Sequence, residues 1–175
     1  GPEALTQCCN VPNGGAVTIA GNFVTTGAIT TSGGNGGVGP NTSSVRLGGA
    51  GGSITITATN SITTTGAIDA HGGAGSTGNS LGAPIAGDAG HGGGVTLTGG
   101  VAVTVGTIDT SGGAAGEVAI DSGVGDITTG SITTRALSPV SGGGAVLLSA
   151  ATGRIVVNGS IDTRGSDSLG ILIDS

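Results

Sequence analysis

The chain has 175 residues, of which 41 are glycine and only 8% are charged, and its formal net charge is −6. Disordered chains combine low hydrophobicity with high charge, whereas the mean hydropathy here is +0.35, so the composition favours an ordered protein. Four arginines and no lysine exclude the basic surface that phosphate binding requires, and we expect no nucleic-acid partner. No stretch is long and apolar enough for a transmembrane helix, so we expect no membrane span.

Residues 1–13 are predicted to be an N-terminal tail, and residues 14–175 a single domain. The first two residues, Gly1-Pro2, resemble the remnant of a cleaved expression tag. The tail contains the only cysteines, Cys8 and Cys9, and adjacent cysteines make neither a disulfide framework nor a metal site. They remain thiols without a role in the domain, thiols that pair with another chain, or a ring disulfide between neighbours.

An internal repeat begins at Val17 and continues to the end of the chain. Each copy contains two short apolar–polar–apolar segments and then a third short segment that begins with isoleucine. The first segments of the copies are Val17-Thr18-Ile19, Ile54-Thr55-Ile56, Val95-Thr96-Leu97, Val118-Ala119-Ile120, Val146-Leu147-Leu148 and Ile171-Leu172-Ile173. Such alternation is typical of β-strands with one buried face.

The length of the repeat varies in one place only. From the start of the first segment to the isoleucine of the third, the copies span 12 to 15 residues. The next copy begins 25 and 27 positions after that isoleucine in the first two cases but 10 to 14 positions after it in the later ones. A constant unit with insertions at one corner is typical of solenoids, so we predict an all-β, right-handed parallel β-helix of about five coils, with glycine-rich corner insertions.

Stacking the coils at the ~4.8 Å spacing of neighbouring strands predicts four inward columns of Val, Ile or Leu. These columns are Val17/Ile54/Val95/Val118/Val146, Ile19/Ile56/Leu97/Ile120/Leu148, Val24/Ile62/Val103/Ile127/Ile155 and Ile29/Ile68/Ile108/Ile132/Ile161. The glycines are expected at corners, where a positive φ and close backbone approach are needed. The two long insertions, residues 31–52 and 71–94, leave from the same corner and are predicted to form a partly ordered flank.

Three aspartates follow the isoleucine of the third segment and are predicted to point outward. Asp69 and Asp109 lie in adjacent copies, and Asp162 lies two copies further on, with Thr30 and Thr133 at the same position in the other copies. A stacked pair of carboxylates suits a retaining glycosidase or a weak Ca²⁺ site. The exchange with threonine favours a third role, capping of the turn that follows.

Two smaller polar groups are weaker candidates. Asp121 and Asp126 frame a short turn that lacks the regular oxygen ligands of a calcium loop, and we expect a solvated corner. His71 and His91 lie near the two ends of one glycine-rich insertion, but two histidines without a third ligand make a weak metal site. We therefore predict no metal and no cofactor, with Ca²⁺ at Asp69 and Asp109 as the alternative.

Threonines form the most regular outward feature. One predicted surface ladder contains Thr25, Thr63, Thr104 and Thr128, and another contains Thr18, Thr55 and Thr96. Flat threonine arrays can order water and bind ice, and Thr57 and Thr98 supply a second row beside the latter ladder. Ala20 takes the second-row position beside Thr18, and Ala119 and Leu147 interrupt the ladder in the later copies. The alternative is that threonine is there for its β propensity and its cross-strand contacts.

The repeat, as in Gly52-Ser53-Ile54-Thr55-Ile56 followed by Ile62-Thr63-Thr64, resembles the passenger repeats of filamentous-haemagglutinin-like and autotransporter-type surface proteins. The resemblance covers residues 14–175 and implies an extracellular or cell-surface protein used for adhesion, for biofilm formation or as a spacer. No nucleophile or nucleotide-binding motif lies in a supporting context, so we expect no enzyme.

Two rival functions remain, a carbohydrate-active enzyme using the stacked aspartates and an ice-binding protein using the threonine ladders. The expected partners are a second copy, joined through the open solenoid ends such as the edge at residues 171–174, or a surface glycan or protein.

Overall fold

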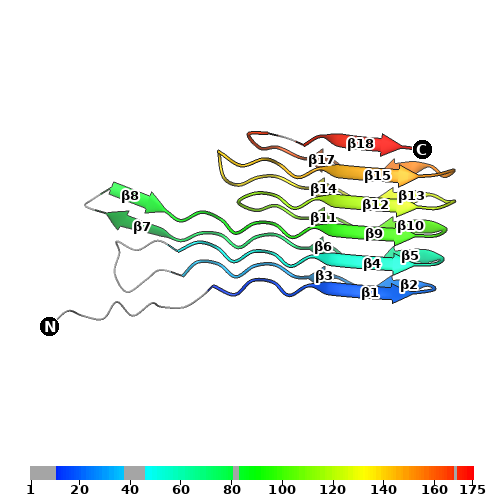
Figure 1. Cartoon of the computed structure of the whole chain (residues 1–175), viewed down its shortest axis with the longest axis horizontal. Coiled ribbons are helices and arrows are strands. Elements are labelled where there is room, and N and C mark those ends of the chain that lie inside the picture. Colours follow the sequence, from blue (N-terminus) through cyan, green and yellow to red (C-terminus); the bar gives the residue numbers. More distant parts are fainter. Residues whose placement is uncertain (1–10, 38–45, 81–82, 168) are drawn as a thin grey trace.

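The computed structural model describes residues 11–37, 46–80, 83–167 and 169–175. Over these residues the regular elements are β-strands, and three parallel sheets form the body of the molecule (Figure 1). The described part of the chain contains no helix that is long and apolar enough to cross a membrane. This all-β arrangement agrees with the predicted parallel solenoid.

Each sheet takes one strand from each of the first five repeats, the sixth adds a strand to the first sheet only, and neighbouring strands are parallel and in register. The first sheet contains, in spatial order, β1 (Val17–Gly21), β4 (Ile54–Ala58), β9 (Val95–Gly99), β12 (Val118–Ser122), β15 (Val146–Ala150) and β18 (Ile171–Asp174). The second contains β2 (Val24–Thr26), β5 (Ser61–Thr64), β10 (Ala102–Val105), β13 (Ile127–Thr129) and β16 (Ile155–Val157). The third contains β3 (Ile29–Thr30), β6 (Ile68–Asp69), β11 (Ile108–Asp109), β14 (Ile132–Thr133) and β17 (Ile161–Asp162).

The four predicted apolar columns are confirmed by the strand register. Val17 pairs with Ile54, Ile54 with Val95, and the series continues through Val118 and Val146. The columns of the second and third sheets follow their predicted order in the same way. Members in the middle of the stack are fully buried in one continuous core. Alternation of apolar and polar side chains thus places one face of each strand in the middle of the stack in the core.

The sequence did not predict a set of inward threonines just after the third sheet. The Oγ1 hydroxyl groups of Thr31, Thr110 and Thr134 donate hydrogen bonds to the carbonyl oxygens of Gly52, Gly116 and Gly144, at 2.7, 2.8 and 2.8 Å. The same three glycines return a backbone N–H to the carbonyl oxygen of the same threonine. This double contact, which we call the threonine clamp, closes the linker onto the next coil.

We predict that the Thr134→Val variant loses about 1–3 kcal/mol of unfolding free energy, because valine keeps the shape but leaves the buried Gly144 carbonyl without its hydroxyl donor. The matched control is Thr128→Val, on an outward position of β13, which should change the stability by no more than about 0.5 kcal/mol. Urea denaturation of both variants measures the difference. Equal losses of unfolding free energy in the two variants would show that the hydroxyl hydrogen bond of the clamp adds no stability.

The linkers between the third sheet and the next strand of the first sheet pack beside one another, and we call them the glycine flank. The described linker residues are 31–37, 46–53, 70–80, 83–94, 110–117, 134–145, 163–167 and 169–170. Figure 1 shows that they extend away from the sheets, and that the linkers after β3 and β6 reach further than the later ones. An antiparallel hairpin of β7 (Thr77–Ser80) and β8 (Ala83–Ala86), which the sequence did not predict, lies within the linker after β6.

Backbone hydrogen bonds tie the outgoing and returning halves of these linkers together. The N–H groups of Gly34, Gly49, Gly73 and Gly90 donate at 2.8 Å to the carbonyl oxygens of Pro12, Gly34, Gly49 and Gly73, in that order. Gly113 continues the series by donating to Gly90 at 2.7 Å. The chain of hydrogen bonds crosses back and forth between the two halves of the flank, so the described residues of the flank form an ordered second layer of the molecule.

Within one half of the flank, the hydrogen bonds recur every third residue. Gly48, Gly51 and Ile54 donate to the carbonyl oxygens of Asp88, His91 and Gly94. A period of three is that of the polyproline II conformation, whereas a β-strand has a period of two. This returning segment therefore packs with the threefold period of polyproline II rather than as a β-strand.

Of the two reasons predicted for the many glycines, the need for a positive φ is wrong and the need for close backbone approach is confirmed. Among the described glycines a positive φ occurs only at Gly170, so left-handed turns do not explain their abundance. Close backbone approach does explain it. A Cβ atom added at Gly49, Gly73 or Gly90 would run into the carbonyl oxygen of Pro12, Gly34 or Gly49, respectively.

Candidate functional site

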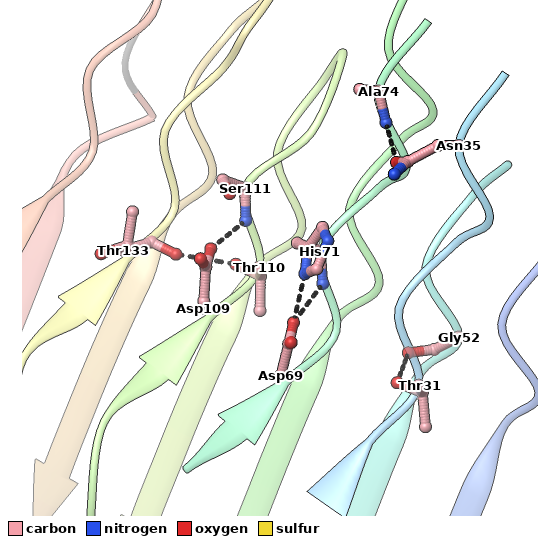
Figure 2. A network of polar contacts seen from close by, with 10 residues as sticks. All are labelled: Thr31, Asn35, Gly52, Asp69, His71, Ala74, Asp109, Thr110, Ser111 and Thr133. Atoms are coloured by element: carbon pink, nitrogen blue, oxygen red, sulfur yellow. Dashed lines mark hydrogen bonds and ion pairs between the residues drawn. The ribbon is translucent and has the colours of Figure 1, made fainter. Parts of the chain in front are cut away.

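Aspartates end three strands of the third sheet and cap the turns that follow. Figure 2 shows the corner around Asp69 and Asp109, which end β6 and β11. Oδ1 of Asp109 accepts a hydrogen bond from the backbone N–H of Ser111 at 2.8 Å, and Oδ1 of Asp69 accepts one from His71 at 3.2 Å. Asp162, at the end of β17, caps its turn in the same way. This contact two residues ahead is the typical turn contact of aspartate, so the turn-capping interpretation is confirmed.

Asp69 and Asp109 are direct neighbours in the register of the third sheet, with Thr30 on one side and Thr133 on the other. Besides its turn contact, Asp69 meets the Nδ1 atom of the His71 ring, and both side chains are partly exposed. Across the described residues there is no group of three or more His, Cys, Asp or Glu side chains that could hold a metal ion. The turns therefore account for the position of this carboxylate pair without a bound cation or sugar.

Arginines form ion pairs with two aspartates, Asp162 and Asp126. Nε and Nη2 of Arg164 donate to the carboxylate of Asp162 at 2.8 and 2.7 Å. These side-chain hydrogen bonds, aided by the Arg164 backbone N–H, lower the pKa of Asp162 to about 2. At the corner between the first two sheets, the backbone N–H of Arg154 lowers the pKa of Asp126, and the Arg154 guanidinium adds an exposed ion pair. Asp121, the other end of that predicted turn, projects from β12 and is exposed.

The pair of Asp162 and Arg164 predicts a pH-dependent stability. Because the pKa of Asp162 lies below the ordinary value of 3.8, its stabilising effect is complete above about pH 4 and disappears as the pH falls towards 2. The Asp162→Asn substitution should lower the free energy of unfolding by up to about 1 kcal/mol at pH 7, as expected for a surface pair. At pH 2 it should lower the free energy of unfolding far less. Urea midpoints at the two pH values measure this. The pH dependence should be smaller in an Arg164→Gln background, which keeps the backbone N–H donor but removes the guanidinium. A difference between Asp162→Asn and the wild-type protein that is the same at both pH values would contradict the prediction.

The histidines predicted as a weak metal pair have separate surroundings. The His71 ring contacts Asp69, as described above. His91 lines a depression of about 350 Å³ on the glycine flank, together with Asn13, Asp88, Ser138 and Ser141. This depression joins residues of the longer and the shorter linkers, and sequence spacing alone gave no signal for it. Cys8 and Cys9 lie outside the described residues.

Both predicted threonine ladders are confirmed by the strand register. On the second sheet the ladder is Thr25, Thr63, Thr104 and Thr128, which Val156 then follows. On the first sheet the ladder is Thr18, Thr55 and Thr96, continued by Ala119 and Leu147. A shallow depression of about 300 Å³ lies on the outer face of the first sheet, where small Ala119 stands between Thr96 and Leu147.

The outward surface of the first sheet is thus the broadest regular candidate for binding. It presents two side-chain columns, whereas the threonine ladder of the second sheet is a single column that ends at Val156. Comparison with known proteins adds no family to these observations, because no protein-family model, curated protein or solved structure matches the chain.

Proposed function

We propose that the chain is a non-enzymatic structural or adhesive segment of an extracellular or cell-surface protein, folded as a right-handed parallel β-helix of about five coils. The observation that carries this proposal is the continuous set of apolar columns, buried in the middle of the stack, beneath outward positions that repeat short polar side chains. A repeat of this kind supplies length and a regular surface. The resemblance of the repeats to filamentous-haemagglutinin-like and autotransporter-type proteins supports a stalk, an adhesin segment or a fibre-forming subunit.

The rival proposal is a carbohydrate-active enzyme that uses Asp69 and Asp109. The turn contacts of both carboxylates favour the structural role. Incubation of the protein with a panel of neutral and acidic polysaccharides, followed by reducing-end detection, decides between them. We expect no turnover by the wild-type protein. Turnover that disappears in the double variant Asp69→Asn/Asp109→Asn would overturn the structural proposal.

A second copy is the partner that we favour, with a surface glycan or protein as the alternative. The strand β18 has a neighbour on one side only, and Ile173 is 50% exposed although its column partner Leu148 is fully buried. Unpaired edges with apolar side chains are templates for another chain. The expected result is association that increases with concentration in sedimentation experiments, with elongated particles or filaments in electron micrographs, and weaker association of Ile173→Glu. Compact monomers at high concentration would contradict this partner.

A further inference from the structure

The outer face of the first sheet carries a small two-column array over its first three strands. We call it the threonine face, and its members are Thr18, Ala20, Thr55, Thr57, Thr96 and Thr98. The register places Thr18, Thr55 and Thr96 in one column and Ala20, Thr57 and Thr98 in the other. Residues between them point into the core, since Ile56 and Leu97 are fully buried. Five of the six outward positions are therefore threonine on three adjacent strands.

This part of the sheet differs from the rest in its chemistry. None of the residues in β1, β4 and β9 is charged, whereas β12 continues the two columns with Ala119 and Asp121. The next strands add leucine, serine and aspartate at the same positions. Threonine is short and restricted at χ1, so the threonine face presents hydroxyl and methyl groups that lose little entropy on contact. Figure 1 shows β1, β4 and β9 lying one above another.

The spacing of these positions is close to that of tetrahedrally bonded water. Neighbouring strands lie ~4.8 Å apart, and residues two apart in a strand lie ~6.6 Å apart. Water molecules joined by hydrogen bonds of ~2.75 Å at the tetrahedral angle put second-neighbour oxygens ~4.5 Å apart, and the hexagonal lattice repeats along its axis every ~7.3 Å. The spacing between strands and the spacing along a strand thus each lie within about 0.7 Å of one of these two ice distances.

We propose that the threonine face binds ice. Water held between hydroxyl groups of adjacent strands takes positions of the ice lattice, and the methyl groups fill the spaces between those water molecules. A charged side chain would impose its own hydration shell and disturb this order, so the lack of charge on the three strands matters. This activity goes beyond the proposed structural role, because a stalk or an adhesin for another ligand needs no such lattice match.

The test compares two substitutions in one coil. Thr55→Tyr places a bulky ring in the centre of the threonine face, and Thr63→Tyr places the same ring on the single ladder of the second sheet. Thermal hysteresis and the shape of growing ice crystals are measured for the wild-type protein and both variants, with circular dichroism melting to verify the fold. We expect ice shaping by the wild-type protein and by Thr63→Tyr, and loss of the effect in Thr55→Tyr.

A gain of function provides an independent measurement. The double variant Ala119→Thr/Asp121→Thr extends both columns by one strand and removes the nearest charge, so it should produce a larger hysteresis gap than the wild-type protein at equal concentration. Absence of ice shaping by the folded wild-type protein would overturn the proposal. Equal loss in Thr55→Tyr and Thr63→Tyr, or a smaller gap in the extended variant, would also overturn it. None of these results bears on the structural role, which the sedimentation and turnover experiments test separately.

Discussion

Gly49→Ala should destabilise the protein by about 3 kcal/mol or more, at the upper end of the range for overpacked positions. A Cβ atom at this position would run into the carbonyl oxygen of Pro12 and lie 3.0 Å from the backbone nitrogen of Gly34. Both atoms belong to backbone that is already joined by a hydrogen bond of 2.8 Å. They cannot move apart without breaking contacts in the flank. Urea denaturation measures the loss.

The matched control is Gly27→Ala, between the second and third sheets. Gly27 is exposed, and a Cβ atom there would meet nothing within 4 Å. Alanine reduces the entropy of the unfolded chain, so this variant should be more stable by about 0.4–1 kcal/mol. Equal effects of the two substitutions would contradict close packing of the flank.

Ile120→Ala should lower the free energy of unfolding by about 2–5 kcal/mol, the usual effect of removing a large buried side chain. Ile120 lies in the middle of the first sheet and is 1% exposed. Its own column supplies the control, because Ile173 at the edge of the stack is 50% exposed. Ile173→Ala should therefore cost only about 1 kcal/mol. Calorimetric or urea unfolding of the two variants ranks them, and a cost for Ile173→Ala as large as that for Ile120→Ala would contradict the burial gradient.

The body of the fold was predictable because its repeat has a physical period. Alternation in Ile54-Thr55-Ile56 and its equivalents predicts both the strands and the direction of each side chain. Stacking then has one register that keeps all apolar residues inside, since a slip by one residue would expose every one of them. The register of the first sheet from Val17 to Val146 follows that rule.

The glycine flank was less predictable because its order comes from contacts between backbones. Glycine carries no side-chain pattern, so the sequence cannot show which N–H meets which carbonyl group. The period of three between Gly48 and Gly51 appears only when the partner residues Asp88 and His91 are known. The preference of glycine for positive φ suggested turns, but the need for space without a Cβ atom determined most of the described positions.

Buried threonines were missed for a related reason. Thr110 and Thr134 are polar, and polar residues are usually exposed, so nothing in the sequence indicated that they lie in the core. Each becomes acceptable in the core because its hydroxyl group reaches a carbonyl oxygen of the returning linker. The aspartate turns, in contrast, were predictable from local chemistry, because Asp109 acts on a residue only two positions ahead.

The glycine flank, over its described residues, and the three sheets form one ordered, hydrogen-bonded body. Native-state hydrogen exchange of individual amides tests this claim most directly, because protection reports opening of single hydrogen bonds. The amides of Gly49, Gly73 and Gly90, which donate to flank carbonyl oxygens at 2.8 Å, should exchange as slowly as that of Ile120 in the core. Exchange of these glycines at the rate of an unfolded peptide, with Ile120 still protected, would contradict the claim.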